Sequence, residues 1–328
     1  MRIGLTFDLQ LDPTDERQAE FDSPQTLDAL TGALRELGHE VIWLGSAHDL
    51  LVACDRLSDV DFVFNIAEGL WGRCREAWVP TILELLRVPY VGSNAVALAL
   101  GLDKAMCKRL AISTGIRTPQ WVVVDGPQDL PAVVPLAFPI IVKPRYEGSG
   151  MGIDPQAVVH GDAALRRRVE WLGRWLKAPL LIEEFVPFGE LTVFLIGNEP
   201  LAALPVIQRL LDPDSRLSCH VVDRYGQPRT QWLCPVELTP ALEREARTAA
   251  VAMFKALGCQ DVARADFRVS ETGELFFLEI NPLPSFDPEG SLGLMAEHLG
   301  TTYTDLVGRI LEAAVKRLQP VTGAYTTS

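Results

Sequence analysis

Residues 262–281 combine carboxylates, an arginine and an asparagine in one predicted β-hairpin with a turn at Thr272-Gly273. A two-residue turn at that point places Asp266 opposite Glu279, and Arg264 opposite Asn281. Strand side chains alternate between the two faces of a sheet, so these four side chains share one face. The other face is expected to join the core, through Ala265, Phe267, Leu278 and Ile280.

Two carboxylates that face each other across a strand pair repel and destabilise the sheet unless something compensates their charge. Asp, Glu and Asn oxygens are ligands that Mg²⁺ prefers, so Asp266, Glu279 and Asn281 are candidate metal ligands. The alternative is a solvated face on which Arg264 merely neutralises the two acids.

A second candidate site lies in residues 138–153, where a predicted buried strand ends at Lys143 and a glycine-rich turn follows. The turn contains Gly148, Gly150 and Gly152. Glycines let backbone N–H groups converge on an anion, and a nearby lysine adds positive charge. The pattern is neither a Walker P-loop nor G-x-G-x-x-G. It therefore predicts an anion site outside those two nucleotide folds, the alternative being a glycine-rich hairpin without a ligand.

The elements that position these groups are predicted to form three units. Strands at 3–7, 41–44 and 60–66 alternate with helices, one beginning at Ser23-Pro24 and ending at Gly38, another at 79–86. Such alternation predicts a parallel α/β domain, expected over residues 1–93. Two α+β units are expected over 94–185 and 186–320, followed by a tail over 321–328. Their expected elements are helices at 103–110, 163–176 and 240–257, strands at 121–124, 139–143, 180–185, 191–196 and 202–206, and two closing helices at 292–299 and 303–318.

Composition limits the class of protein. The 328 residues contain 30 Lys and Arg against 43 Asp and Glu, a net charge of −13. This charge argues against a general nucleic-acid or anionic-membrane partner. Apolar runs are far shorter than the roughly 20 residues that cross a bilayer. The six cysteines form no C-x-x-C pair, and the five histidines show no metal-binding spacing. We therefore expect a cytoplasmic protein.

Five separated motifs occur in an order that resembles the ATP-grasp superfamily, and most closely the D-alanine–D-alanine ligases. They are Leu-Asp-Lys at 102–104, Lys143 with its glycine loop, Leu-Leu-Ile-Glu-Glu-Phe-Val at 180–186, Arg264-x-Asp266 and Glu279-x-Asn281. The resemblance runs from about Tyr90 to Leu318. It implies an N-terminal α/β domain followed by a two-subdomain ATP-grasp module.

The resemblance assigns most of the motif residues to ATP and Mg²⁺. Lys104 and Lys143 would hold the ATP phosphates, under a mobile loop at 147–152. Glu183, Phe185 and the Val186 backbone would contact adenine, and Glu190 the ribose. Asp266, Glu279 and Asn281 would ligate two Mg²⁺ ions. The complete expected ATP site is Lys104, Lys143, Glu147, Gly148, Ser149, Gly150, Gly152, Glu183, Glu184, Phe185, Val186, Glu190 and Phe277.

The implied activity is ATP-dependent ligation of a carboxylate to an amine through an acyl phosphate, on amino-acid substrates. Arg264 would act beside the transferred phosphate, together with Lys143, Ser149 and Tyr225. Arg224 and Tyr225 resemble a pair that caps the substrate, although Tyr225 is equally consistent with an ordinary loop aromatic. The family also often forms dimers through the first domain. D-alanine–D-alanine ligase proper, a small-molecule kinase and a nucleotide-binding regulatory module remain as alternatives.

The substrate half of the sequence departs from those ligases. Their His-Gly segment and acid-rich loop are replaced by residues 64–76, and their N-terminal glycine turn with its glutamate is missing. Glu68, Arg73, Arg75 and Glu76 are candidates for substrate recognition, the alternative being a salt-bridged loop. Ser285 stands where the family has an oxyanion-hole glycine. Ser291 belongs to a serine-leucine pair that in the family helps to bind the second substrate's carboxylate, although one extra residue precedes it here.

Overall fold

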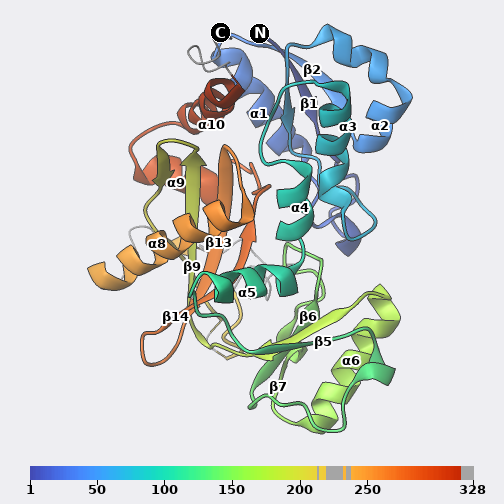
Figure 1. Cartoon of the computed structure of the whole chain (residues 1–328), viewed down its shortest axis with the longest axis vertical. Helices are drawn as coiled ribbons and strands as arrows, with labels where there is room; N and C mark the ends of the chain where they lie inside the picture. The colour runs from blue at the N-terminus through green and yellow to red at the C-terminus, as the bar shows by residue number, and fades with distance from the viewer. Residues whose placement is uncertain (213, 219–231, 234–237, 319–328) are drawn as a thin grey trace, which may run out of the picture.

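The computed structural model describes residues 1–212, 214–218, 232–233 and 238–318. Its first part is a four-stranded parallel sheet in the order β2-β1-β3-β4, with helices in the connections (Figure 1). The strands are β1 (Arg2–Thr6), β2 (Glu40–Gly45), β3 (Phe62–Asn65) and β4 (Tyr90–Val91). The connecting helices are α1 (Pro24–Glu36), α2 (Ala47–Val52) and α3 (Trp78–Leu86), with 3-10 turns at Glu16–Gln18, Cys54–Asp59 and Arg75–Ala77.

Helix α1 begins and ends where its sequence predicts. The Ser23 hydroxyl accepts a hydrogen bond of 3.1 Å from the Thr26 amide, and Pro24 occupies the first helical position. Leu27, Leu30 and Leu34 are buried at helical spacing. Beyond the helix, Gly38 has a φ of 84°, a conformation that favours glycine.

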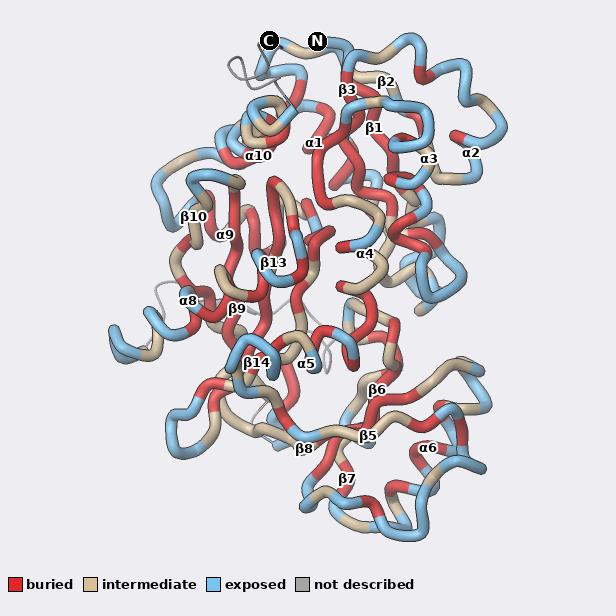
Figure 2. Tube along the Cα trace, in the orientation of Figure 1, coloured by how far each residue is buried: buried red, intermediate tan, exposed pale blue. Residues whose placement is uncertain are grey.

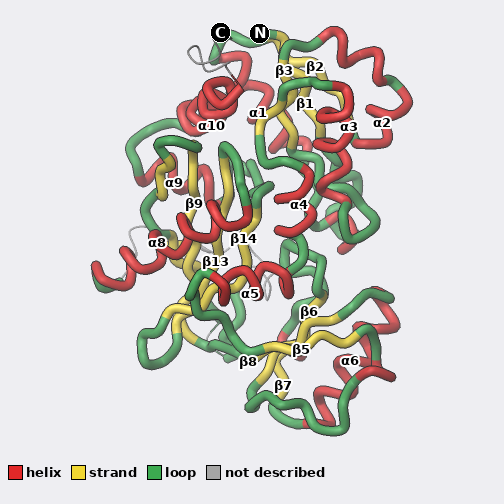
Figure 3. The backbone as a smooth tube through the Cα atoms, viewed as in Figure 1, coloured by secondary structure: helices red, strands yellow, loops and turns green. Residues whose placement is uncertain are grey.

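The central part carries the predicted Lys143 strand in a four-stranded antiparallel sheet, ordered β5-β8-β6-β7 (Figure 3). Helix α6 packs on one face of this sheet through Leu165, Val169 and Leu172. The elements are α4 (Ala95–Gly101), α5 (Lys104–Ser113), β5 (Trp121–Val124), β6 (Ile140–Pro144), β7 (Val158–Val159), α6 (Asp162–Leu176) and β8 (Leu180–Glu184), with 3-10 turns at Pro127–Asp129 and Pro155–Ala157.

The last part is built on a six-stranded antiparallel sheet, in which β10 pairs with β9 beside the path β12-β11-β9-β13-β14. Figure 2 shows β9 and β13 as largely buried. The elements are β9 (Phe188–Gly197), β10 (Leu201–Ala203), β11 (Ile207–Arg209), β12 (Trp232–Leu233), α8 (Pro240–Leu257), β13 (Val262–Val269), β14 (Leu275–Asn281), α9 (Ser291–His298) and α10 (Tyr303–Leu318).

The single strand predicted at 202–206 is wrong, because only residues 202–203 belong to a strand, β10, and residues 204–206 connect it to β11. Both pair with β9, but Pro205 lies between them and has no backbone N–H to donate. The N–H of the preceding residue, Leu204, still bonds to the Phe194 carbonyl, at 2.8 Å. Pairing with β9 then resumes at Ile207.

The β13–β14 hairpin has the predicted partners at its functional end but a different turn. The Ser270 amide bonds to the Glu274 carbonyl at 2.9 Å, so the loop contains three residues rather than two. An irregularity between Asp266 and Phe267 leaves Leu278 as an extra residue in β14. The two shifts cancel, and Arg264 still pairs with Asn281 and Asp266 with Glu279.

The first sheet and the closing helices share one hydrophobic core, because α10 packs directly on α1 (Figure 1). Asp261 adds a polar connection between these parts. Its carboxylate accepts from the Gly92 amide at 2.9 Å and from Arg317 on α10 at 2.7 and 2.9 Å. Because Asp261 is fully buried, these partners compensate a charge that water cannot reach.

We expect Asp261→Asn to lower the free energy of unfolding by about 3 kcal/mol, the cost of breaking a buried ion pair. Asparagine tolerates the φ of 65° at this position, so the change removes charge rather than backbone geometry. Denaturant unfolding measures the effect, and Asp59→Asn at an exposed position is the control. Equal stability of the two variants would contradict the role given to Asp261.

In the part of the chain that the structure describes, no helix combines the length and apolar character needed to cross a membrane.

Candidate active site

A cavity of about 540 Å³ lies where the three parts of the chain meet. Strands β6 and β8 contribute Lys143 and Glu183, and β13 and β14 contribute the hairpin residues. The predicted residues that line it are Glu68, Lys104, Lys143, Glu147, Gly148, Ser149, Gly150, Glu183, Glu184, Phe185, Val186, Glu190, Arg264, Asp266, Glu279, Asn281, Ser285 and Ser291. The fold thus brings most of the sequence-predicted site into one place.

The hairpin residues interact on one face, as their register requires. The Asp266 carboxylate accepts from Arg264 Nη2 at 2.8 Å, from Asn281 Nδ2 at 3.2 Å and from Thr192 Oγ1 at 2.6 Å. Thr192, on β9, is a contributor that the hairpin sequence alone does not indicate. These contacts fix the orientation of Asp266 toward Asn281.

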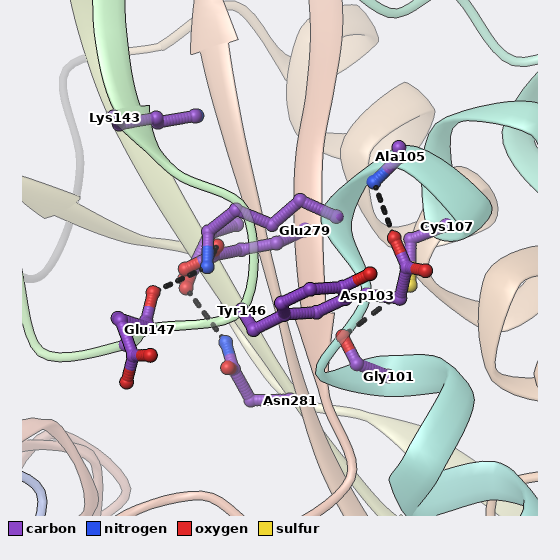
Figure 4. Close-up of polar contacts among 12 residues, drawn as sticks. Gly101, Asp103, Ala105, Cys107, Lys143, Tyr146, Glu147, Glu279 and Asn281 are labelled. Atoms are coloured by element: carbon purple, nitrogen blue, oxygen red, sulfur yellow. Dashed lines mark hydrogen bonds and ion pairs between the residues drawn. The ribbon is translucent and has the colours of Figure 1, made fainter. Parts of the chain in front are cut away.

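Glu279 is held beside Lys104, whose Nζ lies 3.3 Å from its Oε2. Burial alone would raise the pKa of Glu279, but Lys104, Lys143 and Arg264 outweigh it and lower that pKa to about 2. Glu279 is therefore ionised at neutral pH. Figure 4 shows Glu279, Glu147 and Asn281 close together, with Lys143 extending from β6.

The donor set fits Mg²⁺ that keeps part of its shell for water and phosphate oxygens, as Mg²⁺ commonly does. Two carboxylates and one amide meet on the hairpin face. Within the described residues, no group of three or more His, Cys, Asp or Glu side chains is placed to hold a metal. The protein thus supplies only part of a coordination shell, the remainder being left to phosphates and water.

A buried carboxylate connects the two lysine-bearing elements. Glu183 Oε1 lies 2.6 Å from Lys143 Nζ, and its Oε2 lies 2.7 Å from Lys108 Nζ. Burial would raise the pKa of Glu183, but the two lysines outweigh it and lower the pKa. Lys108 was not identified from the sequence, although its position four residues after Lys104 places both on one face of α5.

The glycine loop binds carboxylates through its backbone N–H groups. Gly148 N donates to Glu20 Oε1 at 2.6 Å, and Gly152 N donates to Glu16 Oε1 at 3.1 Å. Lys104 Nζ donates to the Glu147 carbonyl at 2.6 Å. The loop therefore presents donors to anions, as its glycine content predicts. Gly152 does so without lining the cavity.

Glu16 and Glu20 are contacts that sequence reasoning missed, because they come from a segment more than 100 residues before the loop. Arg75 connects Glu20 to the glycine loop. Its Nη2 lies 2.6 Å from the Glu20 carboxylate and 3.1 Å from the Glu147 carboxylate. Arg75 is buried in these ion pairs. This is the salt-bridged arrangement that was the alternative to substrate recognition.

Four predicted positions in the described part of the chain lie outside the cavity lining: Gly152 and Arg75, described above, and Phe277 and Arg73. Phe277 is fully buried against Phe267 in the core, and Leu278 lines the cavity instead. The expectation for Phe277 is corrected by the extra residue in β14, which reverses the faces of these two side chains. Arg73 is exposed, 3.9 Å from Asp103 and over the Tyr146 ring. Arg224 and Tyr225 lie outside the described residues.

The acids expected near adenine and ribose have protein partners. Glu190 lies 2.9 Å from Arg268 Nη2 and 3.5 Å from Arg209 Nε. Glu184, Phe185 and Val186 border the same part of the cavity. Glu76, weighed with Glu68 as a substrate contact, also lines the cavity and is buried.

Two antiparallel sheets that enclose a cavity with lysines, a glycine loop and a carboxylate pair are the architecture of an ATP-grasp enzyme. A family model described as "D-ala D-ala ligase C-terminus" matches residues 113–312. The chain belongs to the D-alanine–D-alanine ligase family. This confirms the expected class, an ATP-dependent ligase that forms carbon–nitrogen bonds.

Individual relatives agree with this assignment. A D-alanine–D-alanine ligase of Cupriavidus metallidurans is 36% identical over 262 residues, covering 79% of this chain and 77% of that protein. The uncharacterized protein y4sG of Sinorhizobium fredii is 31% identical over 298 residues, covering 88% and 87%. The solved structure of D-alanine–D-alanine ligase from Bacillus anthracis complexed with ATP has a TM-score of 0.77. It is 24% identical and covers 97% of this chain and 98% of that chain, which supports the fold.

Proposed function

We propose that this enzyme joins a small carboxylate to an amine, on amino-acid substrates, with an acyl phosphate as intermediate. The substrate carboxylate attacks the γ-phosphate of ATP, and ADP leaves. The amine then attacks the acyl carbon and expels phosphate, so the products are amide, ADP and phosphate. Because ATP is a substrate, we place the reaction in the cytoplasm; a homodimer through the first domain remains a proposal.

The residues around the cavity suit this chemistry. Lys104 and Lys143 would hold phosphate oxygens, and the glycine loop would donate its N–H groups to them after exchanging its carboxylate partners. Glu183–Val186 and Glu190 would border the adenosine. Arg264 would stabilise the negative charge that develops on the phosphate and on the acyl oxygen.

Asp266, Glu279 and Asn281 would hold Mg²⁺, which supplies charge neutralisation on the phosphates when bound. Ser149 would act in the loop, and Ser285 and Ser291 would contact the substrates. Tyr225 and Arg224 keep the role of a proposed substrate cap.

The observation that carries the proposal is the convergence of Arg264, Asp266, Glu279 and Asn281 with Lys104 at one wall of the cavity. A nucleotide-binding module without turnover has no need for this set. A kinase would share it, and the test therefore distinguishes amide formation from phosphorylation. D-alanine–D-alanine ligation is one specific form of the proposal.

The test measures phosphate release from ATP and Mg²⁺ with D- and L-amino acids, singly and in pairs, with mass spectrometry of the products. We expect release that needs two substrates and a product with the mass of a dipeptide. A D-alanine dimer would identify the substrate of the named relatives. A stable phosphorylated product formed without an amine would contradict the ligase and indicate a kinase.

A further inference from the structure

The ATP-grasp elements line the cavity with both cations and carboxylates, whereas the described residues of the first domain that line it include carboxylates and no lysine or arginine. The lysines and arginines that line it in the described part of the chain come from the ATP-grasp elements, and are Lys104, Lys143, Arg209, Arg264 and Arg268. The first domain contributes carboxylates instead, Glu20, Asp22, Glu68 and Glu76, and the loop before α9 adds Asp287 and Glu289. The substrate end is therefore acidic.

Most of these first-domain acids lack a protein partner. Glu20 is paired with Arg75 and the Gly148 amide. By contrast, the side chains of Asp22 and Glu76 form no hydrogen bond or ion pair with any described residue, although they are only 9% and 7% exposed. Glu68 lines the same wall, also without such a partner among the described residues.

Their environment disfavours negative charge. Burial raises the pKa of Asp22 to about 8, with Asp8 and Asp287 adding to the effect. Burial and Glu20 raise the pKa of Glu76 to about 8, against Arg75 and Lys104. Burial and then Glu76, Glu20 and Asp22 raise the pKa of Glu68. Unpaired buried carboxylates cost folding free energy, and such groups are concentrated at functional sites.

The first-domain acids are spread along the wall, which suits an organic cation whose donor groups are separated. Within the described ranges, no group of three Asp, Glu, His or Cys side chains, these acids included, converges on a position for one metal ion. The acids lie along the wall instead, where separate N–H donors of an extended ligand can reach them. The α-ammonium group of an amino acid supplies only one positive charge, whereas three carboxylates without protein partners line this wall.

We propose that Asp22, Glu68 and Glu76 bind a second cationic group, an ammonium or guanidinium on the side chain of an amino-acid substrate. This inference rests on the proposed ligase function, whose substrates it narrows to basic amino acids. The substrate carboxylate would then lie toward Arg264 and the lysines, and its cationic end toward the first domain. The acidic wall would thus orient the substrate between the cationic end of the cavity and the first domain.

The experiment measures binding by calorimetry in the presence of Mg²⁺ and a non-hydrolysable ATP analogue, so that it does not depend on turnover. Ornithine, lysine and arginine, as D and L forms, are compared with norleucine, 2-aminoheptanoate and citrulline, their neutral counterparts. We expect at least one cationic form to bind about tenfold or more tightly than its counterpart, as charge-assisted hydrogen bonds permit. Equal binding for every pair would overturn the inference.

Two variants connect the preference to the acidic wall. Asp22→Asn and Glu76→Gln, alone and combined, keep side-chain volume. We expect them to bring the cation preference, the ratio of the Kd of the neutral ligand to that of its cationic counterpart, close to one. Their melting temperatures without ligand are expected to equal or exceed that of the wild type, since an amide is buried without the free-energy cost of desolvating or protonating a carboxyl group. Glu271→Gln, at the exposed tip of the hairpin, is the control that leaves the preference unchanged.

An unchanged preference in the folded double variant would also overturn the inference. Failure of the proposed function gives a different result. In that case no acid–amine pair produces an amide, while the cation preference in binding and its loss in the variants are still observed. Amide formation with neutral amino acids at equal or greater efficiency would retain the ligase and reject the basic substrate.

Discussion

Arg264→Met is expected to lower phosphate release by about 10²–10³-fold while leaving ATP binding within a few-fold of the wild type. Loss of one preorganised donor to a developing oxyanion has an effect of this size. Arg264 is held against Asp266 by bonds of 2.8 to 3.2 Å, so its guanidinium has a fixed place at the cavity wall. Its contribution should therefore appear in kcat more than in the affinity for ATP.

A lower rate in Arg264→Met must be distinguished from a folding defect. Removing the guanidinium leaves Asp266 with Thr192 and Asn281 as partners, and the melting temperature reports whether the sheet tolerates this. Arg264→Lys keeps the charge but not the forked geometry, and partial recovery of kcat is expected. Arg309→Met, at an exposed position on α10, is the matched control. Unchanged kcat in folded Arg264→Met would remove Arg264 from the proposed chemistry.

The hairpin shows why local motifs were predictable. Asp266, Glu279, Arg264 and Asn281 lie within 18 residues of one another, and strand alternation alone determines that they share a face. The predicted turn was too short by one residue, and the extra residue in β14 compensates. The extra residue shifts the alternation in β14, so Leu278, expected in the core, lines the cavity, and Phe277, expected in the ATP site, is buried in the core.

The contacts that sequence reasoning missed join residues that are distant in the chain. Glu20 contacts Gly148 across 128 positions, and Arg75 of the first domain contacts Glu147 of the glycine loop. No local pattern contains such a pair, since it depends on how two domains pack. The position of Lys108 could have been predicted, because its spacing of four residues from Lys104 places both on one face of a helix. Its partner Glu183 lies on β8, which is distant from α5 in the sequence.

Glu279→Gln is expected to raise the Mg²⁺ concentration needed for half-maximal phosphate release by about a hundredfold, and to lower the maximal rate. Loss of even an outer partner of a metal site costs about 10–100-fold, and a proposed ligand should reach the upper end of that range. The low pKa of Glu279, which Lys104, Lys143 and Arg264 maintain against burial, keeps it charged throughout neutral pH. The neutral amide cannot replace that charge.

The measurement is a Mg²⁺ titration of phosphate release at saturating ATP, with Asp266→Asn as a second variant expected to behave alike. Glu274→Gln, also on the hairpin but half-exposed beside Arg117, is the matched control and should follow the wild type. Glu279 also lies beside Lys104, so a change in ATP affinity alone would indicate that it positions the lysine instead. A wild-type Mg²⁺ dependence in both variants would exclude the hairpin as the metal site. A shift confined to the two variants would place the metal at the pair of carboxylates that the sheet register holds opposite each other.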